Sequence, residues 1–167
     1  QEIVSCSKWY GNKGCKGGFP GRVFEYCTAE GLSTSIDYPY TGKKSQCRRN
    51  IPKYYYKLAG YRELTRGDEE NLLRAIYNFG PISINMNAKH DEFLFYKSGI
   101  LNIPDCSPYN LDDAALAVGY NLNGTPYLLV KNSFGRNWGE DGYFRILLFR
   151  RNMCGIATQA SFPIPLI

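Results

Sequence analysis

The chain has 167 residues, of which 44% are hydrophobic and 15% aromatic, which is enough to bury the core of one domain or of two small halves. Its formal net charge is +5, but the basic residues are scattered along the chain, so we expect no nucleic-acid partner. No apolar run reaches the roughly 20 residues that a membrane helix needs, so we expect no membrane partner.

Two helices are expected, and the first lies in segment 19–31. It begins with Pro20 and ends at Gly31, which is the usual asymmetry of a short helix. Val23 and Cys27 stand one turn apart and therefore share a face. The segment predicts one short helix with a partly apolar side.

The second expected helix occupies segment 67–81. Asp68 is a suitable N-cap, Glu69 and Glu70 suit the positive end of the helix dipole, and Gly80–Pro81 stops the helix. The apolar stripe consists of Leu72, Leu73, Ile76 and Tyr77.

After this helix the apolar period changes from helical spacing to two, which is typical of strands. Segment 81–87 alternates apolar and polar residues, and segment 115–132 predicts a hairpin that turns at Asn123–Gly124. Segment 142–150 supplies a further strand. The order of elements predicts an α+β fold with a boundary near Tyr61.

Six cysteines indicate disulfides rather than a metal site. No two of them are separated by only two to four residues, and the chain has a single histidine, His90, so zinc spacing is absent. We therefore expect no metal and no cofactor, and an oxidising compartment: lysosomal, vacuolar or secreted. The triplet at Asn123 fits an N-glycosylation acceptor.

The densest basic clusters lie at 42–50 and 149–152, and neither contains an acidic residue. Each stands beside a cysteine. We favour solvated loops near crosslinks, with a polyanion-binding patch as the alternative.

Seven motifs, in order and spacing, resemble the papain family of cysteine peptidases, and most closely its cathepsin L-like branch. They are CKGGFP (15–20), YPYTG (38–42), GPIS (80–83), FLFYKSGI (93–100), AVGY (117–120), KNSFGRNWGEDGYFRI (131–146) and CGIA (154–157). The resemblance implies an α+β fold of two subdomains. A helical left half would span 1–61 and be incomplete, a β-barrel-like right half would span 62–155, and 156–167 would return to the left half.

The resemblance also implies that the peptidase chemistry is altered. The nucleophilic cysteine of the family lies in an N-terminal segment that would precede Gln1. Asp113 stands at the position of the family's histidine, and Asn132 matches the residue that orients that histidine ring. A carboxylate raises the pKa of a neighbouring thiol, where an imidazolium lowers it, so Asp113 is not expected to function as the base.

By the same resemblance, residues of both halves would bind an extended peptide. Polar residues at two of these positions favour either a changed side-chain preference or a closed groove with surface polar residues. The substrate-binding positions are Gly17, Gly18, Phe19, Pro20, Asn85, Leu111, Asp112, Ala114 and Gln159.

The resemblance pairs Cys6 with Cys47 and Cys106 with Cys154, and joins Cys15 to the missing segment. A Cys15–Cys27 bond is the alternative for the two remaining cysteines. The expected partner is the N-terminal chain of the protein's own precursor or a larger protein assembly, with extended peptides as further ligands.

Two functional hypotheses follow from these residues. The first is a catalytically inactive papain-like protein that acts by binding or within an assembly. The second is the large chain of a cysteine endopeptidase whose chemistry is completed by a group outside this sequence. Asp113 favours the first. A carboxylate metal site at Asp112 and Asp113 is disfavoured because adjacent strand residues point to opposite faces.

Overall fold

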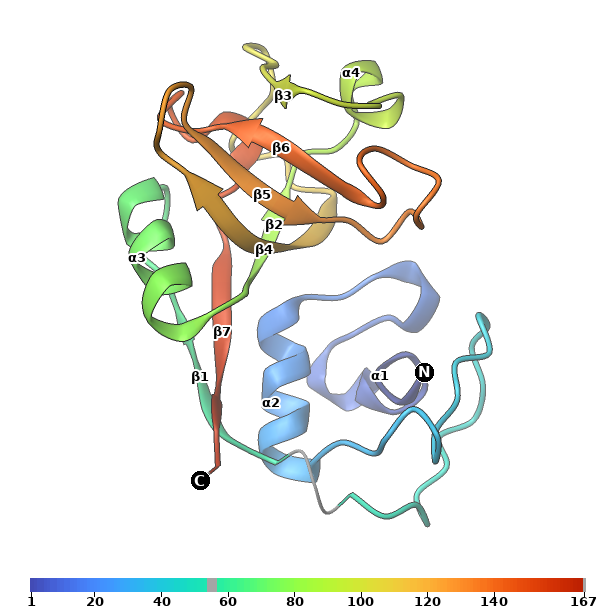
Figure 1. Cartoon of the computed structure of the whole chain (residues 1–167). Coiled ribbons are helices and arrows are strands. Elements are labelled where there is room, and N and C mark those ends of the chain that lie inside the picture. Colours follow the sequence, from blue (N-terminus) through green and yellow to red (C-terminus); the bar gives the residue numbers. More distant parts are fainter. Residues whose placement is uncertain (54–56, 167) are drawn as a thin grey trace. The chain divides into compact units, whose positions relative to one another are not determined.

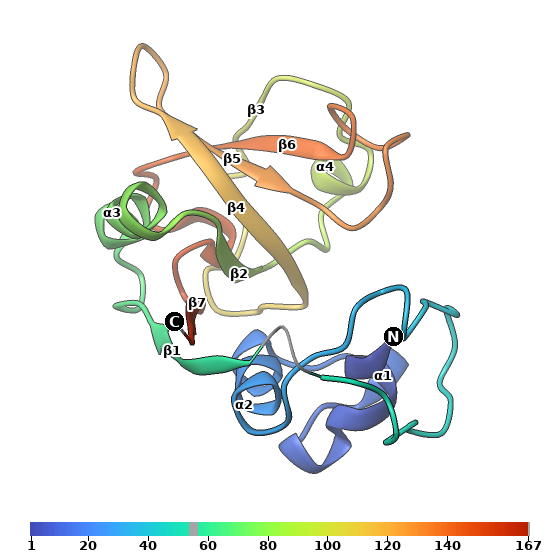
Figure 2. The same ribbon diagram turned by 60° about the horizontal axis from the view of Figure 1, so that its bottom comes forward.

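The computed structural model describes residues 1–53 and 57–166. It divides into two compact units, which we call the first unit (Gln1–Arg62 with Pro163–Ile167) and the second unit (Glu63–Phe162). Figures 1 and 2 show the elements of each. Within the described part of the chain, no helix is long and apolar enough to cross a membrane. Helices and a mixed sheet are both present, which confirms the α+β class.

The first unit is built mainly from short helices. The chain runs through α1 (Glu2–Cys6), the 3₁₀ helices η1 (Ser7–Tyr10) and η2 (Gly14–Lys16), and α2 (Pro20–Glu30) before it reaches strand β1 (Leu58–Glu63). The prediction for α2 is confirmed, with Pro20 as its first residue and Gly31 as its C-cap at φ +72°. A side chain at position 31 would also meet the carbonyl oxygen of Lys53 at 2.8 Å, so glycine is required there.

The second unit holds most of the sheet. Its helices are α3 (Glu69–Phe79), α4 (Asp91–Leu94) and the 3₁₀ helix η3 (Met153–Gly155), and its strands are β2 (Ile82–Met86), β3 (Ile100–Leu101), β4 (Asp113–Asn121), β5 (Tyr127–Lys131) and β6 (Tyr143–Leu147). Strand β7 (Ala160–Pro165) and β1 both continue across the boundary between the units. The strand order is β1-β7-β2-β4-β5-β6-β3.

Local signals in the sequence place α3 and the hairpin correctly. The Asp68 carboxylate accepts the Asn71 N–H at 2.8 Å, so the predicted N-cap of α3 is confirmed. Strands β4 and β5 pair antiparallel from Leu116–Lys131 to Asn121–Tyr127, with Gly124 at φ +74° in the connection. The predicted hairpin is therefore confirmed, although its loop is longer than a two-residue turn.

Helix α3 contacts β4 and β2, and Figure 1 shows it beside these strands. The core of the second unit lies among these elements and includes side chains that are fully shielded from solvent. The largest of them are Phe93, Phe144, Leu72, Ile82, Ile84, Met86, Leu128, Ile146, Leu148 and Ile156. Burial on this scale is the main stabilising contribution to the sheet and fixes where its polar residues stand.

Candidate functional site

Asp113 is the first residue of β4 and is partly buried. Its backbone pairs with Met86 of β2, and its own carboxylate accepts the Ala114 N–H at 2.8 Å. Burial raises the pKa of Asp113 above its ordinary value; the Ala114 hydrogen bond opposes this rise and the nearby Asp112 charge adds to it. The side chain at position 113 is therefore an acid whose charged form is disfavoured.

Asp112 precedes this strand and has a different set of partners. Its Oδ1 accepts the Ala88 N–H at 2.9 Å, and its Oδ2 lies 3.9 Å from Lys89 Nζ. Its backbone N–H donates to the carbonyl oxygen of Met86 at 3.0 Å. Asp112 thus ties the end of β2 to the start of β4. No cluster of three or more metal-ligating side chains occurs in the part of the chain that the structure describes.

Asn132 follows β5 and is only 8% exposed. Its Oδ1 accepts the Ser133 N–H at 2.7 Å, and its backbone N–H donates to Gly142 at 2.9 Å. Its Nδ2 has no hydrogen-bond partner among the described residues. Leaving a buried donor unpaired costs about 1–3 kcal/mol, so the Asn132 Nδ2 does not stabilise the fold through any contact among the described residues.

Asp113 and Asn132 belong to the same end of the hairpin. Leu116 of β4 pairs with Lys131 of β5, and Asp113 lies before Leu116 while Asn132 follows Lys131. The structure therefore places both residues expected at the catalytic centre at one end of two paired strands.

Aromatic side chains pack together in the loop that follows Asn132. Phe134 is 45% exposed and its ring lies 5.3 Å from that of Trp138. Trp138 also packs against Phe93 at 5.1 Å and donates its Nε1–H to the carbonyl oxygen of Leu94 at 3.0 Å. Trp138 is therefore a packing residue that anchors the 132–143 loop to α4.

Three of the expected pocket residues of the second unit meet at Asn85 of β2: Asn85 itself, Ala114 of β4, and Gln159, which directly precedes β7. Asn85 of β2 pairs with Ala114 of β4, and its Nδ2 donates to the carbonyl oxygen of Asp113 at 3.5 Å. Its backbone N–H donates to Gln159 at 3.0 Å. Leu111 instead lies against Gly155, where a Cβ would approach its side chain to 2.5 Å. Asn85 is only 8% exposed, so simple strand alternation misjudged how deeply this amide is buried.

In the first unit, the Gly17–Pro20 segment is held by a residue that the sequence did not single out. Asn12 is 5% exposed, and its Oδ1 accepts the Phe19 N–H at 3.0 Å. A Cβ at Gly18 would meet this oxygen at 2.3 Å, so any other residue there must displace the Asn12 amide. Gly17 has φ +103°, which favours glycine for a conformational reason. In the sequence, the only signal of this close approach was the pair Gly17–Gly18, a few residues after Asn12.

The disulfides Cys6–Cys47 and Cys106–Cys154 are both present, with Cα–Cα distances of 4.8 and 4.7 Å. Cys15 and Cys27 are free thiols, so the alternative bond between them is not formed. Burial raises the pKa of Cys27 to about 11. Cys15 is exposed, and a bond from it to a separate segment stays a prediction. Asn123 is exposed in the hairpin loop, and its glycosylation also stays a prediction.

Comparison with known proteins decides the family. The model described as "Papain family cysteine protease" matches residues 1–164. The chain belongs to the papain family. Its papain-like fold is also that of procathepsin L 3 from Tenebrio molitor larval midgut, with a TM-score of 0.92 at 38% identity over 98% of this chain and 54% of that one.

The relatives of this papain-family chain are cathepsin L-like. It is 43% identical to cathepsin L2 of Homo sapiens and 40% identical to cathepsin L of Sarcophaga peregrina, in each case over 98% of this chain. The matches cover 51% and 49% of those proteins. The chain thus spans about half the length of the curated relatives it matches.

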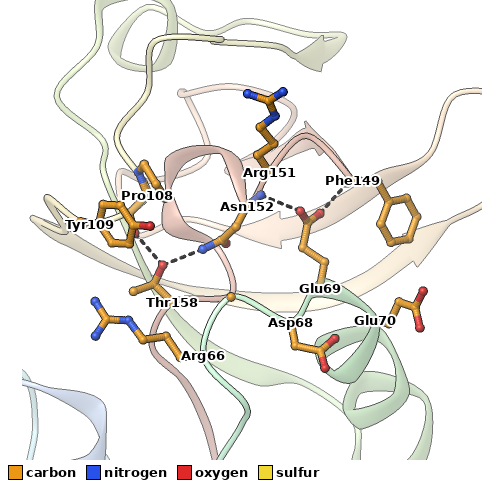
Figure 3. A pocket seen from close by; sticks show the side chains of 11 residues that line it. Arg66, Asp68, Glu69, Glu70, Pro108, Tyr109, Phe149, Arg151, Asn152 and Thr158 are labelled. Carbon is orange, nitrogen blue, oxygen red and sulfur yellow. Dashed lines mark hydrogen bonds between the residues drawn. The ribbon is translucent and has the colours of Figure 1, made fainter.

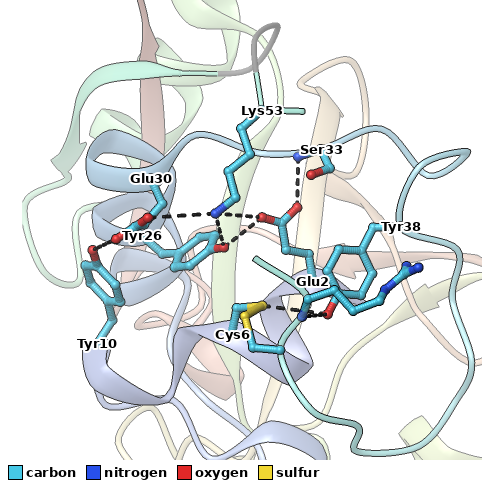
Figure 4. A network of polar contacts seen from close by, with 10 residues as sticks. Glu2, Cys6, Tyr10, Tyr26, Glu30, Ser33, Tyr38 and Lys53 are labelled. Carbon is cyan, nitrogen blue, oxygen red and sulfur yellow. Dashed lines mark hydrogen bonds and ion pairs between the residues drawn. A yellow bond between two sulfur atoms is a disulfide. The ribbon is translucent and has the colours of Figure 1, made fainter. Parts of the chain in front are cut away.

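A buried polar network in the first unit of this papain-family chain was also missed from the sequence (Figure 4). Glu2 is 3% exposed and receives the Tyr26 hydroxyl at 2.7 Å, the Ser33 N–H at 2.8 Å and Lys53 Nζ at 3.3 Å. Burial alone raises the pKa of Glu2, but the hydrogen bonds together lower it below its ordinary value. The network joins α1 to α2 and to Lys53, residues too distant in sequence for any local pattern to reveal.

Proposed function

We propose that this papain-family chain is catalytically inactive as a peptidase and acts by binding or as part of an assembly. The observation that carries the proposal is Asp113, which stands at the position of the family's histidine in the motif order. The alternative, a peptide-hydrolysing large chain, requires an imidazole from outside this sequence.

The chemistry of acyl transfer by a thiol supports this proposal. The nucleophile is a thiolate, which a neighbouring imidazolium stabilises before it donates a proton to the leaving amine. An ionised Asp113 would raise the pKa of a neighbouring thiol and has no proton to donate. A protonated Asp113, which its raised pKa favours, cannot accept the thiol proton.

Asn132 has no catalytic role in this proposal. By the resemblance its Oδ1 would accept an N–H of the histidine ring, and here that oxygen accepts the Ser133 N–H at 2.7 Å. Asn85 of β2 nevertheless pairs with Ala114 of β4 and donates its backbone N–H to Gln159. A chain that keeps these strands without an imidazole is suited to hold an extended peptide and not to cleave it.

The peptidase test uses the purified protein, reduced, between pH 5 and 7, with a fluorogenic cathepsin L substrate. We expect no cleavage. Cleavage that a thiol-directed epoxide abolishes would contradict the proposal. In a form of the protein that carries an intact nucleophile segment, Asp113→His should restore activity, whereas the matched control Asp112→His should not.

We also propose that the N-terminal chain of its own precursor, or a larger assembly, is the partner, held through Cys15. The exposed, free thiol of Cys15 supports this. Mass measurement of native material without reduction tests it. A protease-resistant monomer at the mass of this chain alone would contradict it. Two disulfides fit a lysosomal, vacuolar or secreted location.

A further inference from the structure

An apolar hollow of the second unit has no part in the proposed function. We call it the apolar pocket, and its volume is about 490 Å³. Its apolar lining comes from Leu73 and Tyr77 of α3, from Tyr120 and Leu122 of the hairpin, and from Phe149. Tyr77 is 80% exposed, Leu122 52% and Phe149 48%. Exposed apolar side chains that gather in one hollow, and are not scattered singly, mark an interaction site.

The aromatic wall at Phe149 is held in place by Glu69. The Phe149 backbone N–H donates to the Glu69 carboxylate, which also accepts the Asn152 N–H (Figure 3). Phe149 has φ +60°, a region that residues other than glycine seldom adopt, so these contacts and not its own preference fix its backbone. The wall is therefore preformed, and an occupant does not have to order it.

The apolar pocket has no net charge. Among the described residues that line it, the charged side chains are Glu70 and Arg74, which stand one turn apart on α3 and pair at 3.4 Å. Both are exposed, so one acceptor and one donor lie at the edge of an apolar surface. This combination complements an uncharged occupant that has an apolar face and hydroxyl groups at its edge, as a sugar ring has.

A sugar attachment site adjoins this pocket. The triplet Asn123–Gly124–Thr125 follows directly after Leu122, and consecutive Cα atoms are about 3.8 Å apart. Asn123 and Thr125 are both exposed, as glycosylation requires. Within the described part of the chain, Asn123 is bound only through its backbone N–H, which donates to Asn121 Oδ1 at 2.9 Å. Its side-chain amide is therefore free to carry a sugar, and that sugar starts beside Leu122.

We propose that the apolar pocket holds the first N-acetylglucosamine of an N-linked glycan on Asn123. The C–H face of the sugar ring packs on Leu122 and Tyr77, which removes apolar area of all three groups from water. Its hydroxyl groups face Glu70 and Arg74. The proposal concerns the second unit alone and holds whether or not the chain cleaves peptides.

The attachment uses a lipid diphosphate-linked oligosaccharide as the sugar donor. A bond forms between Asn123 Nδ2 and the anomeric carbon of the first sugar, and Nδ2 gives up one proton. The bond from that carbon to the diphosphate oxygen breaks, and the lipid diphosphate leaves. This donor belongs to the secretory route, which agrees with the oxidising compartment that the two disulfides indicate.

The test produces the protein with high-mannose glycans in secretory eukaryotic cells and trims them enzymatically to a single N-acetylglucosamine, which intact mass confirms. The reference is Thr125→Ala, which removes the attachment signal and keeps Asn123. We expect the single sugar to raise Tm by about 2–4 °C, the scale of one well-packed contact in a chain of this size. Nuclear Overhauser contacts should join the sugar to the ring protons of Tyr77.

Two variants show whether the effect passes through the pocket. In Tyr77→Ser, the Tm difference between the forms with and without the sugar should fall to near zero, because the packing partner is gone. The matched control is Tyr40→Ser: this tyrosine of the first unit is 76% exposed and does not line the pocket, so the full difference should remain.

Each contrary result has its own meaning. An intact mass without sugar at Asn123 would overturn the proposal at the attachment step. An attached sugar that leaves Tm unchanged, or whose effect survives Tyr77→Ser, would overturn the packing and leave glycosylation standing. Dimerisation of the glycosylated protein that Tyr77→Ser abolishes, measured by sedimentation, would overturn the proposal in favour of a contact between two copies of this chain.

Discussion

The side-chain oxygen of Asn132 accepts the Ser133 N–H at 2.7 Å, while its Nδ2, in the same buried amide, has no partner among the described residues. One half of this amide therefore stabilises the fold and the other half destabilises it. The two contributions are of similar size, about 1 kcal/mol for the bond made and about 1–3 kcal/mol for the donor left unpaired.

We predict that Asn132→Ala changes the free energy of unfolding by less than about 1 kcal/mol, because the lost bond and the removed unpaired donor offset each other. Asn87→Ala is the matched control: this amide is equally buried, and its Nδ2 donates to Asn110 at 2.6 Å. Urea unfolding of both variants checks the prediction. A loss at Asn132 as large as that at Asn87 would show that the Asn132 amide has a partner in solution.

Asp113 predicts a pH dependence of stability. Its folded pKa lies above its unfolded value, so the folded state binds more protons there and stability falls as pH rises from the ordinary value of 3.8 through the raised pKa. At pH values above the raised pKa, Asp113 is charged in the folded protein, and the full free-energy cost of burying that charge remains. Asp113→Asn removes the penalty and keeps an oxygen for the Ala114 N–H, so it should stabilise the protein at pH 7 more than at pH 3.

Thermal unfolding at both pH values measures this difference. Asp105→Asn is the control, because this carboxylate is exposed and its replacement should change stability by less than about 0.5 kcal/mol. A gain for Asp113→Asn that is equal at pH 3 and pH 7 would contradict the assignment.

Local patterns predicted the parts of the fold that local interactions determine. Helix α3 begins at the Asp68 cap and ends before Gly80, and both signals lie within one segment. Strand β7 was missed because its sequence, ASFPIP, contains two prolines and lacks clear alternation. Pairing with β2, a tertiary contact, is what makes it a strand.

The candidate site, too, was predictable from the sequence only in part. Motif order located Asp113 and Asn132. No local pattern shows that only the oxygen of the Asn132 amide has a hydrogen-bond partner among the described residues. Nor does any local pattern show that the Asn85 Nδ2 donates to the carbonyl oxygen of Asp113. Arg66 and Arg151, far apart in the chain, both line one hollow of the second unit, which only the folded structure reveals.

Glu2 predicts an acid-sensitive first unit (Figure 4). Its folded pKa lies below its ordinary value of 4.5, so it contributes stability that is present above about pH 4.5 and is lost as pH falls through the folded pKa. Glu2→Gln keeps the shape but removes the charge that faces Lys53, and should destabilise the protein at pH 7 by about 1–3 kcal/mol.

The difference between Glu2→Gln and the parent should shrink as pH falls below 4.5, because the parent carboxylate is then protonated as well. Glu25→Gln, which changes an exposed carboxylate of α2, is the control and should cost less than about 0.5 kcal/mol. A cost of Glu2→Gln that does not change with pH would place its effect in packing and not in charge.

The Gly17–Pro20 segment gives the last prediction, since Asn12 contacts it so closely. A methyl group at Gly18 would stand 2.3 Å from Asn12 Oδ1, so Gly18→Ala must displace the amide from the Phe19 N–H. We expect a loss of about 1–3 kcal/mol, the usual cost of overpacking together with a broken hydrogen bond. Asn12→Ala should lose a similar amount, and the double variant less than the sum, because both changes break the same hydrogen bond.

The control is Gly21→Ala in the first turn of α2, where alanine favours the helix. Chemical unfolding of the four variants measures these terms, and strictly additive losses at Gly18 and Asn12 would show that the two residues do not act through one another.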